Sequence, residues 1–161
     1  MEIRKVKDIE EFLYYIRIKN NSMEEKMWSE TQLTQESFDT LYHHYDAYLV
    51  TIDQQIIGGY LLLENDYSYW NEKDNQDHAY YIHKLFILAP YNKKGYSRQI
   101  IDHIKNIAQT QNKDYLRLDC RYQNIKLNQL YDKLGFKIVR KFNSPVSGKM
   151  NLREYQLSSS R

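Results

Sequence analysis

One short segment of the chain combines the residue types that bind an anion. A strand, a proline, the loop Asn92–Ser97 and a helix follow one another there. A strand that turns directly into a helix aims several backbone N–H groups at one point, where the positive end of the helix dipole favours phosphate. Lys93, Lys94 and Arg98 add positive charge, and Gly95 permits a positive φ and close backbone approach. The segment predicts a phosphate-binding loop; the alternative is a basic helix start with no ligand.

A second segment places polar groups on two regular elements further along the chain. The alternation in Tyr115–Cys120 predicts a strand with Arg117 and Asp119 on one face and apolar residues and Cys120 on the other. The helix expected over residues 126–134 has an apolar stripe that includes Tyr131. Gly135 is predicted to close this helix at its C′ position.

Together the two segments resemble the GNAT N-acetyltransferase family. Its pattern is a strand, then Q/R-x-x-G-x-G/A opening a helix, then a second parallel strand, then N-x-x-(x)-L-Y-x-K-L-G-F. Here it reads Asn92-x-x-Gly95-x-Ser97, the strand LRLDC, Asn124, and LYDKLGF over residues 130–136. Ser97 stands for the family's Gly or Ala and is small enough to keep the loop shape. Asn92 stands for its Gln or Arg, which leaves one anion contact unaccounted for.

The resemblance implies acetyl-CoA as co-substrate. Its pyrophosphate would be wrapped by main-chain amides of the loop residues Lys93, Lys94, Gly95, Tyr96, Ser97 and Arg98. Its pantetheine arm would pair with the backbone of the strand residues Leu85, Phe86 and Ile87. Two parallel strands that splay apart leave amides in need of partners, which the pantetheine amides supply. Asn124 would hydrogen-bond the cofactor near the pantetheine arm.

The implied reaction is direct attack of a neutral amine on the thioester in a ternary complex, with no covalent enzyme intermediate. It needs a base, a polarised carbonyl and an acid for the leaving thiolate. Tyr131 matches the family's tyrosine and is predicted to be the acid, although its apolar stripe also suits a core residue. Asp119 is predicted to be the base, with His83 or water as alternatives, and it equally suits an ion pair with Arg117 or Arg121. Backbone N–H groups near Ile87 would polarise the carbonyl.

Other chemistries are not expected. Cys120 shares a strand face with leucines, where a buried thiol keeps a high pKa, so it is not expected to be a nucleophile. The histidines outside the matched motifs form no cluster with ligand spacing, and we expect no metal.

Acceptor specificity is expected to come from three loops, residues 20–33, 65–77 and 143–149. They bring together carboxylates and aromatic rings, which suit a cationic amine through ion pairs and cation–π contacts, although surface loops are polar in general. A small or polyamine-like amine is therefore preferred over a protein N-terminus. The residues concerned are Glu24, Glu25, Trp28, Glu30, Tyr67, Tyr69, Trp70, Glu72 and Asp74.

These segments are expected to be positioned by an α/β fold with the element order β-α-α-β-β-β-α-β-α-β-β. By resemblance this is a GNAT-type mixed, mostly antiparallel central sheet with two splayed parallel strands and flanking helices. The predicted strands are 2–6, 47–52, 56–63, 80–88, 115–120, 137–142 and 150–157, and the predicted helices begin after Asp8, Thr34, Gly95 and Ile125.

Composition limits the remaining classes of function. The 161 residues predict a single domain, 1–161, and the net charge of +2 gives no electrostatic case for nucleic-acid binding. One cysteine fits a reducing cytoplasm, and neither a signal peptide nor an apolar run long enough for a bilayer is seen. A homodimer is possible. The alternatives to a small-molecule N-acetyltransferase are a protein N-acetyltransferase, a non-catalytic CoA-binding module of the same fold, and a peptide-binding protein.

Overall fold

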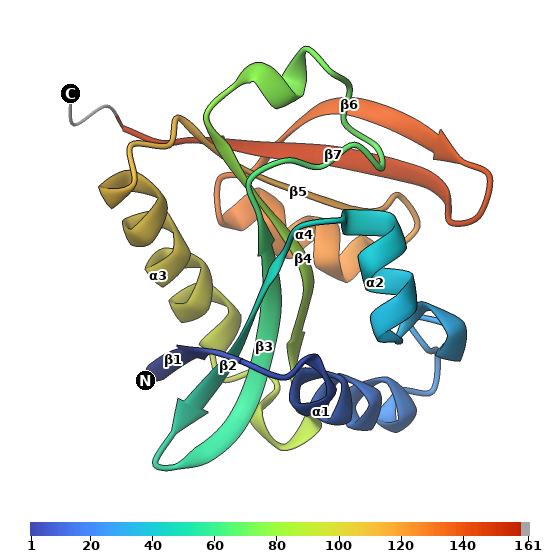
Figure 1. Cartoon of the computed structure of the whole chain (residues 1–161), viewed down its shortest axis with the longest axis vertical. Coiled ribbons are helices and arrows are strands. Elements are labelled where there is room, and N and C mark those ends of the chain that lie inside the picture. Colours follow the sequence, from blue (N-terminus) through green and yellow to red (C-terminus); the bar gives the residue numbers. More distant parts are fainter. Residues whose placement is uncertain (159–161) are drawn as a thin grey trace. The chain divides into compact units, whose positions relative to one another are not determined.

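The computed structural model describes residues 1–158 and shows the elements in the predicted order (Figure 1). The strands are β1 (Glu2–Lys5), β2 (Asp46–Ile52), β3 (Gln55–Leu63), β4 (Ala79–Ile87), β5 (Tyr115–Arg121), β6 (Lys137–Ser144) and β7 (Gly148–Gln156). The helices are α1 (Ile9–Ser22), α2 (Gln35–Tyr42), α3 (Tyr96–Thr110) and α4 (Ile125–Lys133). Within the described residues, no helix has both the length and the apolar character needed to cross a bilayer.

The strands form one mixed sheet in the order β1-β2-β3-β4-β5-β7-β6. The pairs β1–β2, β2–β3, β5–β7 and β6–β7 are antiparallel, whereas β4 and β5 run parallel. A mostly antiparallel sheet with a parallel pair confirms the predicted fold class.

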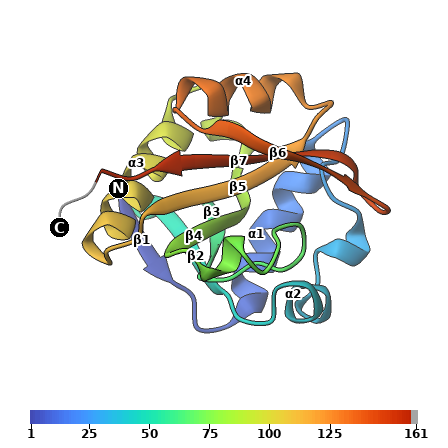
Figure 2. The same cartoon turned by 90° about the horizontal axis from the view of Figure 1, so that it is seen from above.

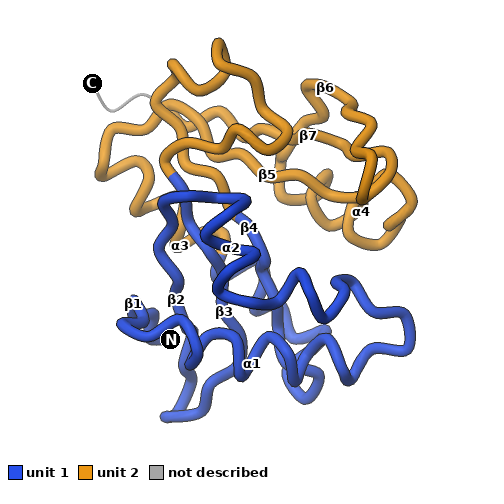
Figure 3. The backbone as a smooth tube through the Cα atoms, turned by 45° about the vertical axis from the view of Figure 1, so that its right-hand side comes forward, with its two compact units in different colours: residues 1–63, 83–100 blue, residues 64–82, 101–161 orange. Residues whose placement is uncertain are grey.

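The chain divides into two compact units, which Figure 3 distinguishes by colour. The first unit contains Met1–Leu63 and His83–Ile100, and the second contains Glu64–Ile82 and the chain from Ile101 onward. Strand β4 and helix α3 each contribute residues to both units. The proposed cofactor loop and the end of β4 therefore belong to the first unit.

In the first unit, α1 packs on β2 and β3. The side chain of Asp8 caps α1 by accepting from the N–H of Glu10, and Phe12 and Ile16 on its apolar face are fully buried. Gly58 of β3 meets β4 closely, since a Cβ at this position would collide with the carbonyl oxygen of Phe86. A glycine is required there because any side chain would push the two strands apart.

In the second unit, β5, β7 and β6 run side by side with α4 along them, as Figure 2 shows. Gly135 follows α4 with φ +88°, as predicted for its C′ position. The parallel ladder within this unit pairs Ala79–Tyr81 of β4 with Tyr115–Arg117 of β5. The splaying of the remaining strand halves stays a prediction.

Candidate functional site

The loop before α3 has the backbone of an anion-binding nest. Lys93 and Gly95 both have left-handed conformations, with φ of +61° and +80°. The first backbone bond of α3 runs from the N–H of Gln99 to the carbonyl of Gly95, so the N–H groups of residues 96–98 precede the helical ladder. Alternating left-handed and right-handed backbone conformations at the start of a helix direct several N–H groups toward one point, which favours binding of an anion.

A cavity of about 150 Å³ opens in the first unit beside this loop. Three of its lining residues come from the end of β4, and two, Asn92 and Ser97, are the first and last residues of the loop. The full lining is Lys19, Met23, Met27, Trp28, Leu85, Phe86, Ile87, Asn92 and Ser97. Four predicted cofactor residues are thereby brought to one cavity: Leu85, Phe86, Ile87 and Ser97.

The other predicted loop residues do not line this cavity. Lys93, Lys94, Gly95 and Arg98 are exposed and Tyr96 is half-buried. Lys94 lies with its ammonium 6.0 Å from the ring of Tyr91. The charges of Lys93, Lys94 and Arg98 face solvent, which would partly screen their attraction to an anion bound at the loop.

Two contributions from the N-terminal half were not predicted. Lys19, in the last turn of α1, donates from Nζ to the side-chain oxygen of Asn92 at 3.1 Å. Asn20, 2 % exposed, donates to the carbonyl of Trp28 at 2.8 Å and accepts from its N–H at 3.1 Å. These two hydrogen bonds fold the segment after α1 back toward the helix and fix Trp28, which lines the cavity. Only Trp28 of these three was a candidate, because the other two looked like ordinary helix-end residues.

The residue before the cavity-lining part of β4 is held in an aromatic cage. Lys84 has φ +54°, and its ammonium donates to the hydroxyl of Tyr42 at 2.8 Å. The same ammonium lies 5.6 Å from the ring of Trp28 and 5.9 Å from that of Phe38. These contacts hold the left-handed backbone of Lys84 in place. His83, the alternative base, is buried and packs against Tyr42 with ring centroids 4.5 Å apart.

The predicted acid and base lie in the second unit. Tyr131 is 5 % exposed, with its ring 5.8 Å from that of Phe136. Burial, followed by the nearby Cys120 and Asp119, raises the pKa of Tyr131 well above its ordinary value. The phenol therefore keeps its proton across the physiological range, as an acid must. Asp119 itself is half-buried on β5.

Asn124 has a structural task that its motif position concealed. Its side-chain oxygen accepts from the N–H of Leu127 at 3.2 Å and caps α4. This bond uses the amide oxygen for the helix start. The predicted contact with a cofactor stays a prediction, and only the amide nitrogen and the oxygen's second lone pair are left to make it.

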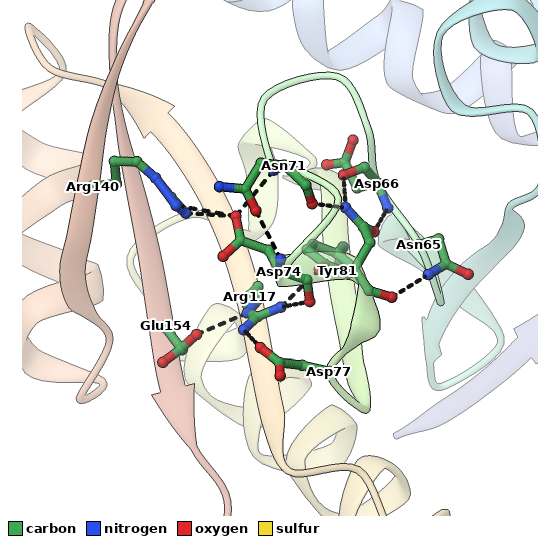
Figure 4. Close-up of polar contacts among 10 residues, drawn as sticks. Asn65, Asp66, Asn71, Asp74, Asp77, Tyr81, Arg117, Arg140 and Glu154 are labelled. Atoms are coloured by element: carbon green, nitrogen blue, oxygen red, sulfur yellow. Dashed lines mark hydrogen bonds and ion pairs between the residues drawn. The ribbon is translucent and has the colours of Figure 1, made fainter.

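Arg117 is the centre of a polar cluster in the second unit, where its carboxylate partners include Asp77 and Glu154 (Figure 4). Arg117 is 2 % exposed, and its guanidinium donates to Asp77 at 2.6 Å and to Glu154 at 2.8 Å. It also donates to the hydroxyl of Tyr81 at 2.8 Å. Burial alone would lower the pKa of Arg117, but the bonds to the two carboxylates outweigh it and raise the pKa above its ordinary value.

The loop over residues 65–77, one of the expected acceptor loops, is fixed by similar contacts. Asn75 donates to two loop carbonyls at 2.8 Å, and Asp74 accepts from both terminal nitrogens of Arg140 at 2.5 and 3.1 Å. Trp70 is 3 % exposed and packs edge-on against a tyrosine. Asp74 and Trp70 thus serve the loop's own structure.

Cys120 should be unreactive in the folded protein. Burial raises the pKa of its thiol from 9.0 to about 11, so at pH 8 the folded state holds about a hundredfold less thiolate than the unfolded state. Labelling by a disulfide reagent at pH 8 is expected to be at least a hundredfold slower than in urea. The raised pKa also links folding to pH. Because the unfolded thiol loses its proton first, the contribution of the protonated Cys120 to the free energy of unfolding is complete below about pH 9 and is lost as the pH rises toward 11. Equal labelling rates in both states would contradict the buried thiol.

The chain is similar to a known protein family and to solved structures of other proteins. The family model described as the acetyltransferase (GNAT) family matches residues 10–136. Among solved structures, a spermidine N-acetyltransferase chimera from Vibrio cholerae and hSSAT is 17 % identical with a TM-score of 0.67, covering 98 % of this chain and 97 % of its own.

Two further solved structures have the same fold. A Bacillus subtilis acetyltransferase in complex with CoA is 15 % identical with a TM-score of 0.70, over 98 % of this chain and 99 % of its own. A ribosomal-protein alanine N-acetyltransferase from Escherichia coli is 14 % identical with a TM-score of 0.68, over 99 % and 96 %. The family match spans most of the chain, and we conclude that this protein belongs to the GNAT acetyltransferase family.

Proposed function

We propose that this protein transfers an acetyl group from acetyl-CoA to a primary amine of a small molecule. The observation that carries the proposal is the cavity beside the loop, where Leu85, Phe86 and Ile87 of β4 meet Ser97 at the start of α3. A neighbour of the same fold was solved with CoA, which supports this choice of donor. The loop amides would hold the pyrophosphate, and the strand would hold the pantetheine arm.

The proposed step forms a C–N bond and breaks the C–S bond of the thioester. The neutral amine attacks the carbonyl carbon, and its proton leaves to Asp119, directly or through water. Tyr131 gives its hydroxyl proton to the departing CoA sulfur, and the phenol is restored by proton exchange with solvent. The products are the N-acetyl amine and CoA with a free thiol.

We also propose that residues 1–161 act as one acyltransferase domain in the cytoplasm. The family match at residues 10–136 runs through segments of both compact units, which supports a single functional domain. The acceptor class is the finer part of the proposal. One structural neighbour is a spermidine N-acetyltransferase chimera and another is a ribosomal-protein alanine N-acetyltransferase, so a protein N-terminus is the second candidate acceptor.

The first experiment is a calorimetric titration of the purified protein with acetyl-CoA and, separately, with CoA. One-site binding in the micromolar range is expected for both. Thiol release is then measured across a panel of primary amines that includes spermidine, single amino acids and an alanine-starting peptide. No binding at millimolar acetyl-CoA would refute the proposal, and binding without turnover would favour a non-catalytic CoA-binding module.

Tyr131→Phe tests the acid. Phenylalanine keeps the ring packed on Phe136 but removes the proton, so kcat on the best amine should fall about a hundredfold while the Kd for acetyl-CoA is unchanged. Tyr155→Phe is the matched control, because that tyrosine packs on the same phenylalanine at 5.7 Å and should lose no activity. An unchanged kcat for the Tyr131 variant would remove this residue from the mechanism.

A further inference from the structure

We propose that Lys19 is a phosphate-binding residue of the acyl-CoA site and that Asn92 holds its ammonium in position. The inference rests on the proposed function. It assigns to helix α1 the anion contact that the Asn92 position of the loop, Gln or Arg in the family pattern, does not itself supply.

The geometry places the ammonium at the edge of the loop. Lys19 Nζ donates to Asn92 Oδ1 at 3.1 Å, and both residues line the cavity together with Ser97. Asn92 directly precedes the left-handed Lys93, where the anion-binding nest begins. An anion held by the nest would therefore lie near the cavity wall that Lys19 and Asn92 form.

The electrostatics of the site favour an anionic partner. Lys19 is half-buried, and burial lowers the pKa of its ammonium. Among the described residues, the hydrogen-bond partner of its ammonium is the neutral side-chain amide of Asn92. A partly desolvated ammonium with a neutral partner gains more from an incoming phosphate than a fully hydrated one does. Burial disfavours the charged form of Lys19 in the free protein, and the same loss of water strengthens its attraction to a bound phosphate.

Lys19 differs in this respect from the lysines of the loop itself. Lys93 and Lys94 are exposed, so their attraction to a ligand is weakened by water and by salt. Of the residues that line the cavity, Lys19 is the one with a formal positive charge. Its effect on affinity should therefore exceed that of either loop lysine.

The test compares two acyl donors that differ in their phosphates. Acetyl-CoA and S-acetylpantetheine, which has no phosphate, are titrated into the wild type and Lys19→Met at two salt concentrations. The variant is expected to bind acetyl-CoA about tenfold more weakly and with a shallower salt dependence. Its affinity for S-acetylpantetheine should equal that of the wild type.

A matched control exists in the same part of the chain. Lys26 also donates to an asparagine, Asn21, at 3.3 Å, but it is exposed and does not line the cavity. Lys26→Met should leave both affinities unchanged. Asn92→Ala should weaken acetyl-CoA binding less than Lys19→Met does, because the ammonium remains but is less well held.

The outcomes separate this inference from the function on which it rests. Failure of the wild type to bind acetyl-CoA overturns the proposed function and this inference together. If the wild type binds acetyl-CoA and Lys19→Met binds it with the same affinity and salt dependence, the inference alone is overturned. Equal losses for both donors also overturn it, since they would mean that Lys19 shapes the cavity and does not contact phosphate.

Discussion

Gly95→Asp is expected to raise the Kd for acetyl-CoA at least a hundredfold, measured by calorimetric titration. Gly95 has φ +80°, and no atom lies within 4 Å of a Cβ built there, so a side chain is accommodated without collision. The aspartate carboxylate would add a negative charge to the loop whose N–H groups are proposed to hold the phosphates. It would compete with the phosphates for those N–H groups and repel their charge.

Two control variants separate charge from backbone strain. Gly95→Asn has the same size and tolerates the left-handed conformation, so most of the affinity should remain. Gly148→Asp introduces the same carboxylate at φ +79°, again with no atom within 4 Å, at the first residue of β7. It should cost similar stability and leave acetyl-CoA binding intact. Equal loss in all three variants would contradict a phosphate site at the loop.

Arg117→Met is expected to destabilise the protein by about 3 kcal/mol. Glu154, with 20 % of its side chain exposed, would keep a carboxylate without its partner, and the hydroxyl of Tyr81 would lose a donor. The cation–π contacts with Trp70 and Tyr115 would be lost as well. Methionine fills much of the volume, so the loss is mainly electrostatic.

Urea unfolding followed by circular dichroism measures the effect. Arg121→Met is the matched control, because Arg121 lies on the same strand and is exposed, and its replacement should change stability by less than about 0.5 kcal/mol. Adding Glu154→Gln to Arg117→Met should restore part of the stability by removing the unpaired charge. A single variant as stable as the wild type would show that the cluster contributes little.

The features that the sequence predicted are those set by local rules. Thr34 caps α2 by accepting from the N–H of Ser37, and Gly135 closes α4 with a positive φ, as their positions indicated. Turn residues and apolar periodicity act over a few residues, so a single sequence contains them.

The features that were missed depend on contacts between distant residues. Lys19 and Asn92 are 73 positions apart, and Arg117 and Glu154 are 37 positions apart. Neither pair leaves a spacing that marks it, since each partner alone resembles an ordinary surface residue. For the same reason Asn124 was recognised through its motif, while its role as a helix cap became evident only with the bond to Leu127.

The left-handed backbone of Lys84 has a consequence for how the side chains that line the cavity can change during evolution. Burial along β4 does not alternate around this residue: Tyr81, Ile82 and His83 are all buried, Lys84 and Leu85 are half-buried, and the next two residues are buried again. The strand therefore behaves as two short strands in tandem, of which the first pairs with β5 and the second lines the cavity. A one-residue insertion or deletion at position 84 would re-register the second part and leave the ladder of the first intact. The left-handed residue thus provides a point at which the side chains that line the cavity can change without rebuilding the sheet.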